Sequence, residues 1–156
     1  MAWSDIAAQI YASAQAGNSV NPGLPANMCN FLVGQAGTET GNGTSNFFLN
    51  NNNCFGYECD SSSSWQDGCS SGDADNGVTV GNYDTIDASV QELVDYWYRR
   101  AADGKGGCPS DLSQISDATQ YANILSSAGY YTSSPTSYAN NITQNLAAAG
   151  NFFRKH

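Results

Sequence analysis

Apolar residues recur at three- and four-residue steps in five segments of the chain, the spacing that places them on one face of an α-helix. We therefore predict five helices, at about residues 5–16, 25–40, 88–102, 117–127 and 136–149. Ser4 is a suitable cap for the first helix and Asp87 for the third, because short polar side chains bond the free amide groups at a helix start.

The segment between about residues 44 and 83 lacks this periodicity. It contains a run of four asparagines, a run of four serines and several glycines, which is typical of loops with one short hairpin. Val78 to Val80 is the clearest strand candidate. A low-complexity linker is the alternative, but six large apolar side chains argue against a solvated segment: Phe47, Phe48, Leu49, Phe55, Tyr57 and Trp65. The pattern predicts a mostly helical α+β protein, one domain over residues 1–156, with a small β lobe at about 44–83.

Glu39 continues the apolar stripe of the second helix, three residues beyond Ala36 and seven beyond Leu32. Gly41 and Gly43 follow and end the helix. A carboxyl group is therefore expected at the last helical turn, at the edge of the apolar interior. Partial burial and the negative end of the helix dipole both raise a carboxyl pKa, as a general acid requires. The alternative is a solvated residue at a frayed helix end.

Composition and charge narrow the function classes. A formal net charge of −9 with only five basic residues argues against nucleic acid and anionic membranes as partners. The only histidine is His156, so Ser-His-Asp and Cys-His catalysis are excluded, and we expect no metal and no cofactor. Nine Tyr and three Trp among many polar residues suit a sugar ligand. Carboxylate chemistry is what remains.

Five cysteines stand at positions 29, 54, 59, 69 and 108, so at least one thiol is unpaired within the chain. Cys59 and Cys69 flank the serine-rich loop and are the pair we expect to be bridged. Cys29 lies on the apolar face of the second helix with Leu32, which indicates a buried thiol.

The residues around Glu39 carry a family resemblance. Gln35, Ala36, Glu39, Gly41, Gly43 and Ser45, followed by Asn53, Phe55 and Gly56, resemble the signature A-Q-A-A-L-E-S-G-W-G-x-S … N-x-F-G-I-K of the bacterial glucosaminidases of glycoside hydrolase family 73. That family includes flagellar peptidoglycan hydrolases and many autolysins. The chain departs from the pattern at Asn42, where the family often has Trp, and at Glu58, where it often has Lys.

Two further stretches extend the resemblance. Residues 72–77, Gly-Asp-Ala-Asp-Asn-Gly, follow Trp65 as T-E-Y-E-N-G follows a Trp in the family, which puts Asp73 at the second acidic position. Asp75, Asp67 and Glu58 are rivals. A calcium loop is a further alternative, although the EF-hand spacing fails here. Residues 128–132, Ala-Gly-Tyr-Tyr-Thr, with Tyr138-Ala139, resemble the family's A-G-Y-A-T-D-x-x-Y-A. The residue that falls on a cleft-lining tyrosine of the family is Tyr130, for which an ordinary core tyrosine is the alternative.

The resemblance spans about residues 24–142 and implies a lysozyme-like fold, a helical lobe and a small β lobe with a cleft between them. We expect Glu39 to be at least half buried and to lie across this cleft from residues 65–80. It implies cleavage of peptidoglycan between N-acetylglucosamine and N-acetylmuramic acid, with Glu39 as general acid, Asp73 as second carboxylate and Tyr130 assisting. Alternatively, the substrate's acetamido group is the nucleophile. The substrate contacts it implies are Gln35, Ser45, Asn53, Phe55, Trp65 and Tyr131. Other readings are a muramidase or lytic transglycosylase on this fold, or a non-catalytic virion or wall-binding module.

The start of the chain lacks a basic segment and carries Asp5 early, so no signal peptide is expected. No run of about 18 apolar residues predicts membrane insertion. We therefore expect a phage lysis enzyme, cytoplasmic before release, or a virion-associated protein, acting on glycan strands as a monomer or within a virion. Delivery would require a holin, a tail or a secretion system.

Overall fold

The computed structural model describes residues 2–71, 79–131 and 133–150. Its helices and strands, in chain order, are α1 (Trp3–Ala16), α2 (Ala26–Thr40), α3 (Asn46–Asn51), β1 (Cys69–Ser71), β2 (Thr79–Gly81), α4 (Ile86–Asp103), α5 (Ala118–Ser127) and α6 (Pro135–Ala148), with single 3-10 turns at Lys105–Gly107 and Leu112–Gln114. The predicted mostly helical α+β class with a small β lobe is confirmed. None of the helices in the described ranges is long and apolar enough to cross a membrane.

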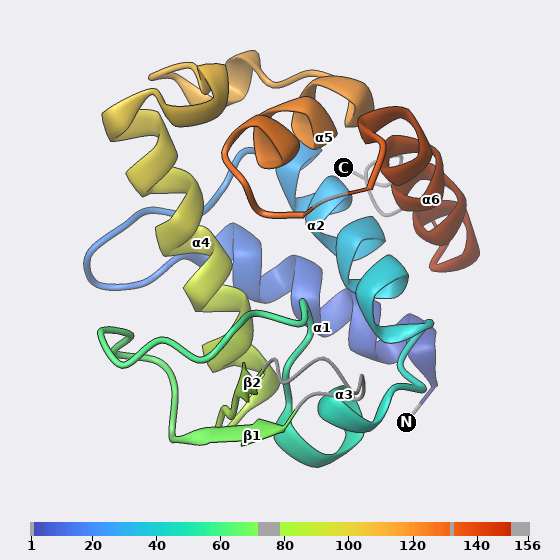
Figure 1. Ribbon diagram of the computed structural model, residues 1–156. Helices are drawn as coiled ribbons and strands as arrows, with labels where there is room; N and C mark the ends of the chain where they lie inside the picture. Colours follow the sequence, from blue (N-terminus) through green and yellow to red (C-terminus); the bar gives the residue numbers. More distant parts are fainter. Residues whose placement is uncertain (1, 72–78, 132, 151–156) are drawn as a thin grey trace.

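Helix α2 runs through the middle of the molecule, between α4 on one side and α6 on the other (Figure 1). Two glycines let α6 approach it closely. A Cβ atom on Gly34 would lie 2.4 Å from the carbonyl oxygen of Ile142, and one on Gly37 would lie 2.9 Å from Cβ of Asn145. Because α2 carries Glu39, this packing fixes the direction in which that helix presents its last turn.

The small β lobe lies at the end of the molecule opposite α5 (Figure 1). Strands β1 and β2 pair antiparallel, with Cys69 opposite Gly81, and Glu58 forms a single bridge with Val80. The strand runs from Thr79 to Gly81 rather than from Val78, which lies outside the described residues. The predicted disulfide between Cys59 and Cys69 is confirmed.

Three local predictions were wrong. α1 begins at Trp3, so Ser4 lies inside the helix and is not its cap. Thr85 caps α4 by accepting a hydrogen bond from the amide of Ala88, while Asp87 lies in the first turn and accepts one from Ser13. Helix α3 was missed because its six residues are too short to show a helical period, and only Phe48 among them is buried.

The three cysteines outside the disulfide, Cys29, Cys54 and Cys108, are buried. Burial raises the pKa of the Cys29 and Cys54 thiols to about 12 and that of Cys108 to about 11. The buried thiol predicted at Cys29 is therefore confirmed, and all three are poor nucleophiles near neutral pH.

Candidate active site

Glu39 lies in the last turn of α2, at the edge of the hydrophobic core. Gly41 adopts a left-handed conformation (φ 59°, ψ 46°) and its amide bonds the carbonyl of Gly37, which ends the helix. Thr40 is fully buried; its hydroxyl donates to the carbonyl of Ala36 and accepts from the amide of Gly43. These contacts lock the turn, so the partly buried Glu39 side chain leaves α2 in a fixed direction.

Glu39 lines a cleft of about 460 Å³. The other walls are Phe55 to Asp60 from the loop after α3, Tyr96 from α4, and Ala128 to Tyr131 from the turn after α5. We predicted that residues 65–80 would face Glu39. The described part of that segment does not line this cleft, because the chain between α3 and the disulfide fills the wall instead.

The two oxygens of the Glu39 carboxyl have different surroundings. Oε1 accepts a hydrogen bond of 2.6 Å from the hydroxyl of Tyr138. Among the described residues no donor reaches Oε2, which faces Gly56: a Cβ atom on Gly56 would lie 3.5 Å from it. Burial raises the pKa of Glu39, and the Tyr138 hydrogen bond offsets part of that rise.

Tyr138 is a site residue that the sequence did not identify. It is buried on α6, and its ring stacks on that of Tyr131 with centroids 3.9 Å apart and planes 12° apart. The available signal was the Tyr-Ala pair at 138–139, which belongs to the second signature but gave no hint that it meets Glu39, 99 residues earlier.

Replacing Tyr138 by Phe should raise the pKa of Glu39 further. The tyrosine hydroxyl stabilises the ionised carboxylate, so its loss leaves the effect of burial unopposed. The ring and its stacking on Tyr131 are retained. Titration of the Glu39 carboxyl carbon by NMR measures the shift, and an unchanged or lower pKa in the folded variant would contradict the assigned hydrogen bond.

Tyr130 stands in the cleft wall among other aromatic rings. Its ring lies edge-on to those of Tyr57 and Tyr96, at centroid distances of 6.1 and 5.4 Å, and its hydroxyl is 3.4 Å from the carbonyl oxygen of Phe55. Burial raises the pKa of Tyr130 well above its usual value, so the phenol stays neutral and acts as a hydrogen-bond donor. Tyr131 also lines the cleft, with its hydroxyl bonded to the carbonyl of Ala122.

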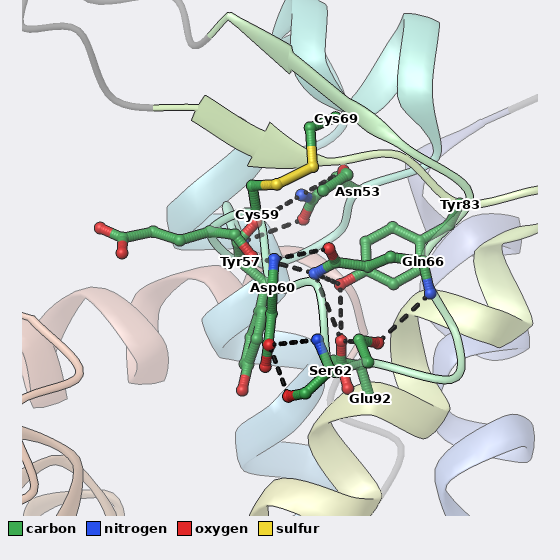
Figure 2. The surroundings of a disulfide bond; sticks show 12 residues. Asn53, Tyr57, Cys59, Asp60, Ser62, Gln66, Cys69, Tyr83 and Glu92 are labelled. Atoms are coloured by element: carbon green, nitrogen blue, oxygen red, sulfur yellow. Dashed lines mark hydrogen bonds between the residues drawn. A yellow bond between two sulfur atoms is a disulfide. The ribbon is translucent and has the colours of Figure 1, made fainter.

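Asn53 shapes the cleft wall instead of facing the cleft. It is fully buried; its amide nitrogen donates to the carbonyls of Tyr57 and Gly81, and its oxygen accepts from the amides of Phe55 and Tyr57. Figure 2 shows Asn53 close to the Cys59–Cys69 disulfide. Its four hydrogen bonds satisfy the amide group, so the predicted direct substrate contact does not fit this geometry.

Two other predicted substrate contacts also lie away from the cleft. Gln35 is fully buried in the core, where its side-chain oxygen accepts a hydrogen bond from the Tyr121 hydroxyl. Ser45 precedes α3 as its N-terminal flanking residue and does not line the cleft. Of the six predicted contacts, Phe55 and Tyr131 line the cleft, whereas Trp65 lines a separate hollow.

Two carboxylates accompany Glu39 in the cleft wall, Glu58 and Asp60. Hydrogen bonds from the hydroxyl and amide of Ser62 hold the pKa of Asp60 below its usual value. Asp67 does not line the cleft. The two candidates in the 72–77 stretch, Asp73 and Asp75, lie outside the described residues.

A buried carboxyl on α4 anchors the loop that carries Glu58 and Asp60. Glu92 is 3% exposed, and its Oε1 accepts hydrogen bonds from Ser63 (2.6 Å) and Gln66 (3.3 Å). The Gln66 amide in turn bonds the carbonyl of Glu58 and the amide of Asp60 (Figure 2). Burial raises the pKa of Glu92. The contact between Glu92 and Gln66 was not predicted from the sequence, because the helical pattern around Glu92 does not indicate a hydrogen-bond partner 26 residues earlier.

Within residues 2–71, 79–131 and 133–150, no three His, Cys, Asp or Glu side chains gather into a possible ion site. The groups that line the cleft include the Glu39 carboxyl, whose pKa is raised, and the neutral phenol of Tyr130.

The family model Glucosaminidase, described as mannosyl-glycoprotein endo-beta-N-acetylglucosaminidase, matches residues 21–150. A search of curated protein sequences gave no match.

Solved structures share the fold. A chain of a type VI secretion system effector-immunity complex from Pseudomonas protegens is 18% identical, with 94% of this chain and 92% of that one covered and a TM-score of 0.61. A peptidoglycan hydrolase from Sphingomonas sp. A1 is 23% identical over 95% and 91%, with a TM-score of 0.60. The glycoside hydrolase domain of FlgJ from Salmonella typhimurium is 18% identical over 95% and 97%, with a TM-score of 0.58. These likenesses confirm the predicted lysozyme-like fold.

Proposed function

The chain belongs to the glucosaminidase family of glycoside hydrolases, and from this premise we propose that it hydrolyses peptidoglycan at the β-1,4 bond from N-acetylglucosamine to N-acetylmuramic acid, with Glu39 as general acid. The resemblance to glycoside hydrolase family 73 found in the sequence is confirmed by that match. The substrate, the bond and the roles of the residues are parts of the proposal.

One observation carries the proposal: a carboxyl group with a raised pKa stands at the wall of a cleft lined by tyrosines. Glycoside hydrolysis needs a carboxylic acid that protonates the leaving oxygen. Because Oε1 of Glu39 accepts the Tyr138 hydrogen bond, the acid proton is expected on Oε2. That oxygen faces Gly56, where the absence of a side chain leaves room for a glycosidic oxygen.

The cleft's tyrosines suit the rest of the reaction. Sugar rings stack on aromatic faces, and a neutral phenol donates a hydrogen bond to an acetamido carbonyl or a developing charge. Tyr130 takes that role in the proposal. Tyr131 lines the same cleft and is partly exposed, so it supplies apolar contact to the substrate, whereas Phe55 is 1% exposed and packs behind the wall.

Asp73 is the second carboxylate in this proposal, on the strength of the family resemblance. Asp73→Asn should slow hydrolysis strongly, by a factor on the order of 10², whereas Asp75→Asn and Asp67→Asn should change the rate little. Initial rates on purified cell walls measure the effect. Near-wild-type activity of Asp73→Asn would instead favour participation of the substrate's acetamido group, or of Asp60 or Glu58 from the cleft wall.

Product analysis tests the proposed bond. Digestion of purified peptidoglycan, reduction with borohydride and mass spectrometry of the fragments should show N-acetylglucosamine at the new reducing ends. Muramic acid or anhydro-muramic acid ends would instead identify a muramidase or a lytic transglycosylase. Absence of any cleavage by folded protein would point to a non-catalytic wall-binding module.

We propose that the protein reaches the cell wall as a phage lysis enzyme or as a virion component. Export by a secretion system is the other route. In each case the partner is the glycan strand, and residues 1–156 act as one catalytic domain. Among the described residues, one hydrophobic cluster contains side chains from α1, α2, α4, α5 and α6, which supports treating these helices as one unit.

A further inference from the structure

A second hollow, of about 310 Å³, lies between the serine-rich loop and α4. Asp60 lines both this hollow and the Glu39 cleft, so the two meet at that residue. Ser63 and Trp65 from the loop also line this hollow, as do Glu92, Asp95 and Arg99, which follow one another along one face of α4. We call this hollow the Trp65 groove.

The indole of Trp65 is bonded to Asp95, which two asparagines hold in turn. Its Nε1 donates to Oδ2 of Asp95 at 2.7 Å, and Oδ1 of Asp95 accepts from the side chains of Asn18 and Asn21 at 3.0 and 2.8 Å. Trp65 is partly exposed. Trp97, by contrast, is fully buried in the hydrophobic core, and Trp3 packs against that core. A fixed and partly exposed indole is a ready platform for the apolar face of a ligand.

Hydrogen-bonding groups surround this platform. Burial raises the pKa of Asp95, but the hydrogen bonds from Trp65, Asn21 and Asn18 outweigh this effect and hold that pKa below its usual value. The Asp95 carboxyl therefore stays ionised near neutral pH. Glu92 is 3% exposed, and its hydrogen bonds from the described residues all fall on Oε1. No donor in the described part of the chain reaches its Oε2, which leaves a carboxylate oxygen in the groove wall free to accept from a ligand.

Arg99 is the basic side chain among the described residues that line either hollow, and it stands near their junction. Its guanidinium lies 3.4 Å from the hydroxyl of Tyr57, a residue of the Glu39 cleft. The acidic groups outnumber this single cation, which disfavours phosphate-rich ligands. The Trp65 ring, the carboxylate acceptors and the Arg99 guanidinium donor together suit a neutral polyhydroxylated ring. Such a ring stacks on the indole while its hydroxyls form hydrogen bonds with the carboxylates.

We propose that the Trp65 groove is a remote saccharide subsite that binds a hexosamine ring of the same glycan strand, beyond the sugars next to the cleaved bond. This proposal rests on the proposed function, because it requires a polymeric glycan that continues past Asp60. Binding energy from a remote sugar lowers the barrier at the cleaved bond only when substrate reaches both places. The groove therefore makes the enzyme selective for long strands.

The test compares two substrates, long peptide-free glycan strands and a peptide-free tetrasaccharide prepared from them. Trp65→Ala should lower kcat/KM for the long strands about tenfold, the equivalent of about 1.4 kcal/mol of lost stacking, and leave the tetrasaccharide unchanged. Arg99→Gln changes an exposed side chain and leaves the packing of the core intact, and it should also lower kcat/KM for long strands alone. Leu49→Ala is the control, because Leu49 is 62% exposed on α3 and lines neither hollow.

Equal losses on both substrates, or no loss on long strands in either variant, would overturn the remote subsite. A loss that appears only when the strands carry peptides would also overturn it, in favour of a peptide-binding groove. If the wild type cleaves neither substrate, the proposed function fails, and binding is then measured by titrating long peptide-free strands into the proteins. Weaker binding by Trp65→Ala would support the groove, and equal binding would overturn it.

Discussion

Replacing Glu39 by glutamine should reduce peptidoglycan hydrolysis by at least about a hundredfold. General acid catalysis contributes on the order of 10²- to 10⁴-fold, and glutamine has no proton to deliver to the leaving oxygen. Its side-chain oxygen still accepts the hydrogen bond that Tyr138 now donates to Oε1. Shape and contacts in the cleft are therefore conserved, and sedimentation with purified walls should show unchanged binding.

The same substitution should not lower the stability of the fold, and above the pKa of Glu39 it should raise it. Burial raises the folded-state pKa above the unfolded value, so the folded protein binds the proton more tightly than the unfolded chain. The stabilising effect of that proton is present at low pH and is lost as pH rises through the raised pKa. At neutral pH the wild type therefore bears the cost of a partly buried carboxylate, which glutamine avoids. Thermal unfolding of both proteins at pH 4 and pH 8 measures this. Full activity in a folded Glu39→Gln variant would falsify the catalytic assignment.

Replacing Tyr130 by phenylalanine should lower kcat by a factor on the order of 10², the usual loss when one preorganised donor to a developing charge is removed. The ring and its edge-on contacts with Tyr57 and Tyr96 remain. The hydroxyl lies 3.4 Å from the Phe55 carbonyl, a long and weak bond, so the phenol is available to the substrate. The loss should therefore fall on kcat, with little change in the unfolding temperature.

Tyr98→Phe is the matched control for that experiment. It removes the same hydroxyl group from a tyrosine outside the cleft, where it donates to the carbonyl of Gly23. Its activity should equal that of the wild type. Equal activity of Tyr130→Phe and Tyr98→Phe would remove Tyr130 from the mechanism and leave it as a residue of the cleft wall.

The sequence carried enough information for the five longer helices and for the position of Glu39, because both depend on local patterns. The stripe from Leu32 through Ala36 to Glu39 has a helical period, and Gly41 marks the helix end by its left-handed conformation. The Cys59–Cys69 bridge was also accessible, since the two residues flank one short loop. The start of α4 was misjudged by two residues, because Thr85 and Asp87 are both good caps.

The surroundings of Glu39 could not be read in the same way, because they come from distant segments. Tyr138 reaches Glu39 only through the close packing of α6 on α2, and no short-range pattern encodes that contact. A motif residue also need not touch substrate: Asn53 fits the family pattern, and its amide is used entirely in building the loop. Trp65 likewise matches the family, yet it is held at α4 by Asp95.

The pH dependence of kcat/KM for peptidoglycan hydrolysis tests most directly whether Glu39 acts as a protonated acid. The rate of the wild type should fall as pH rises, with a midpoint above the pKa of about 4.3 of an ordinary glutamate, because burial raises the pKa of Glu39 and only the protonated carboxyl delivers a proton. The Glu39→Gln variant should lack this alkaline limb. A wild-type rate that stays constant or increases through that range, or an alkaline limb that persists in the variant, would show that Glu39 is not the general acid.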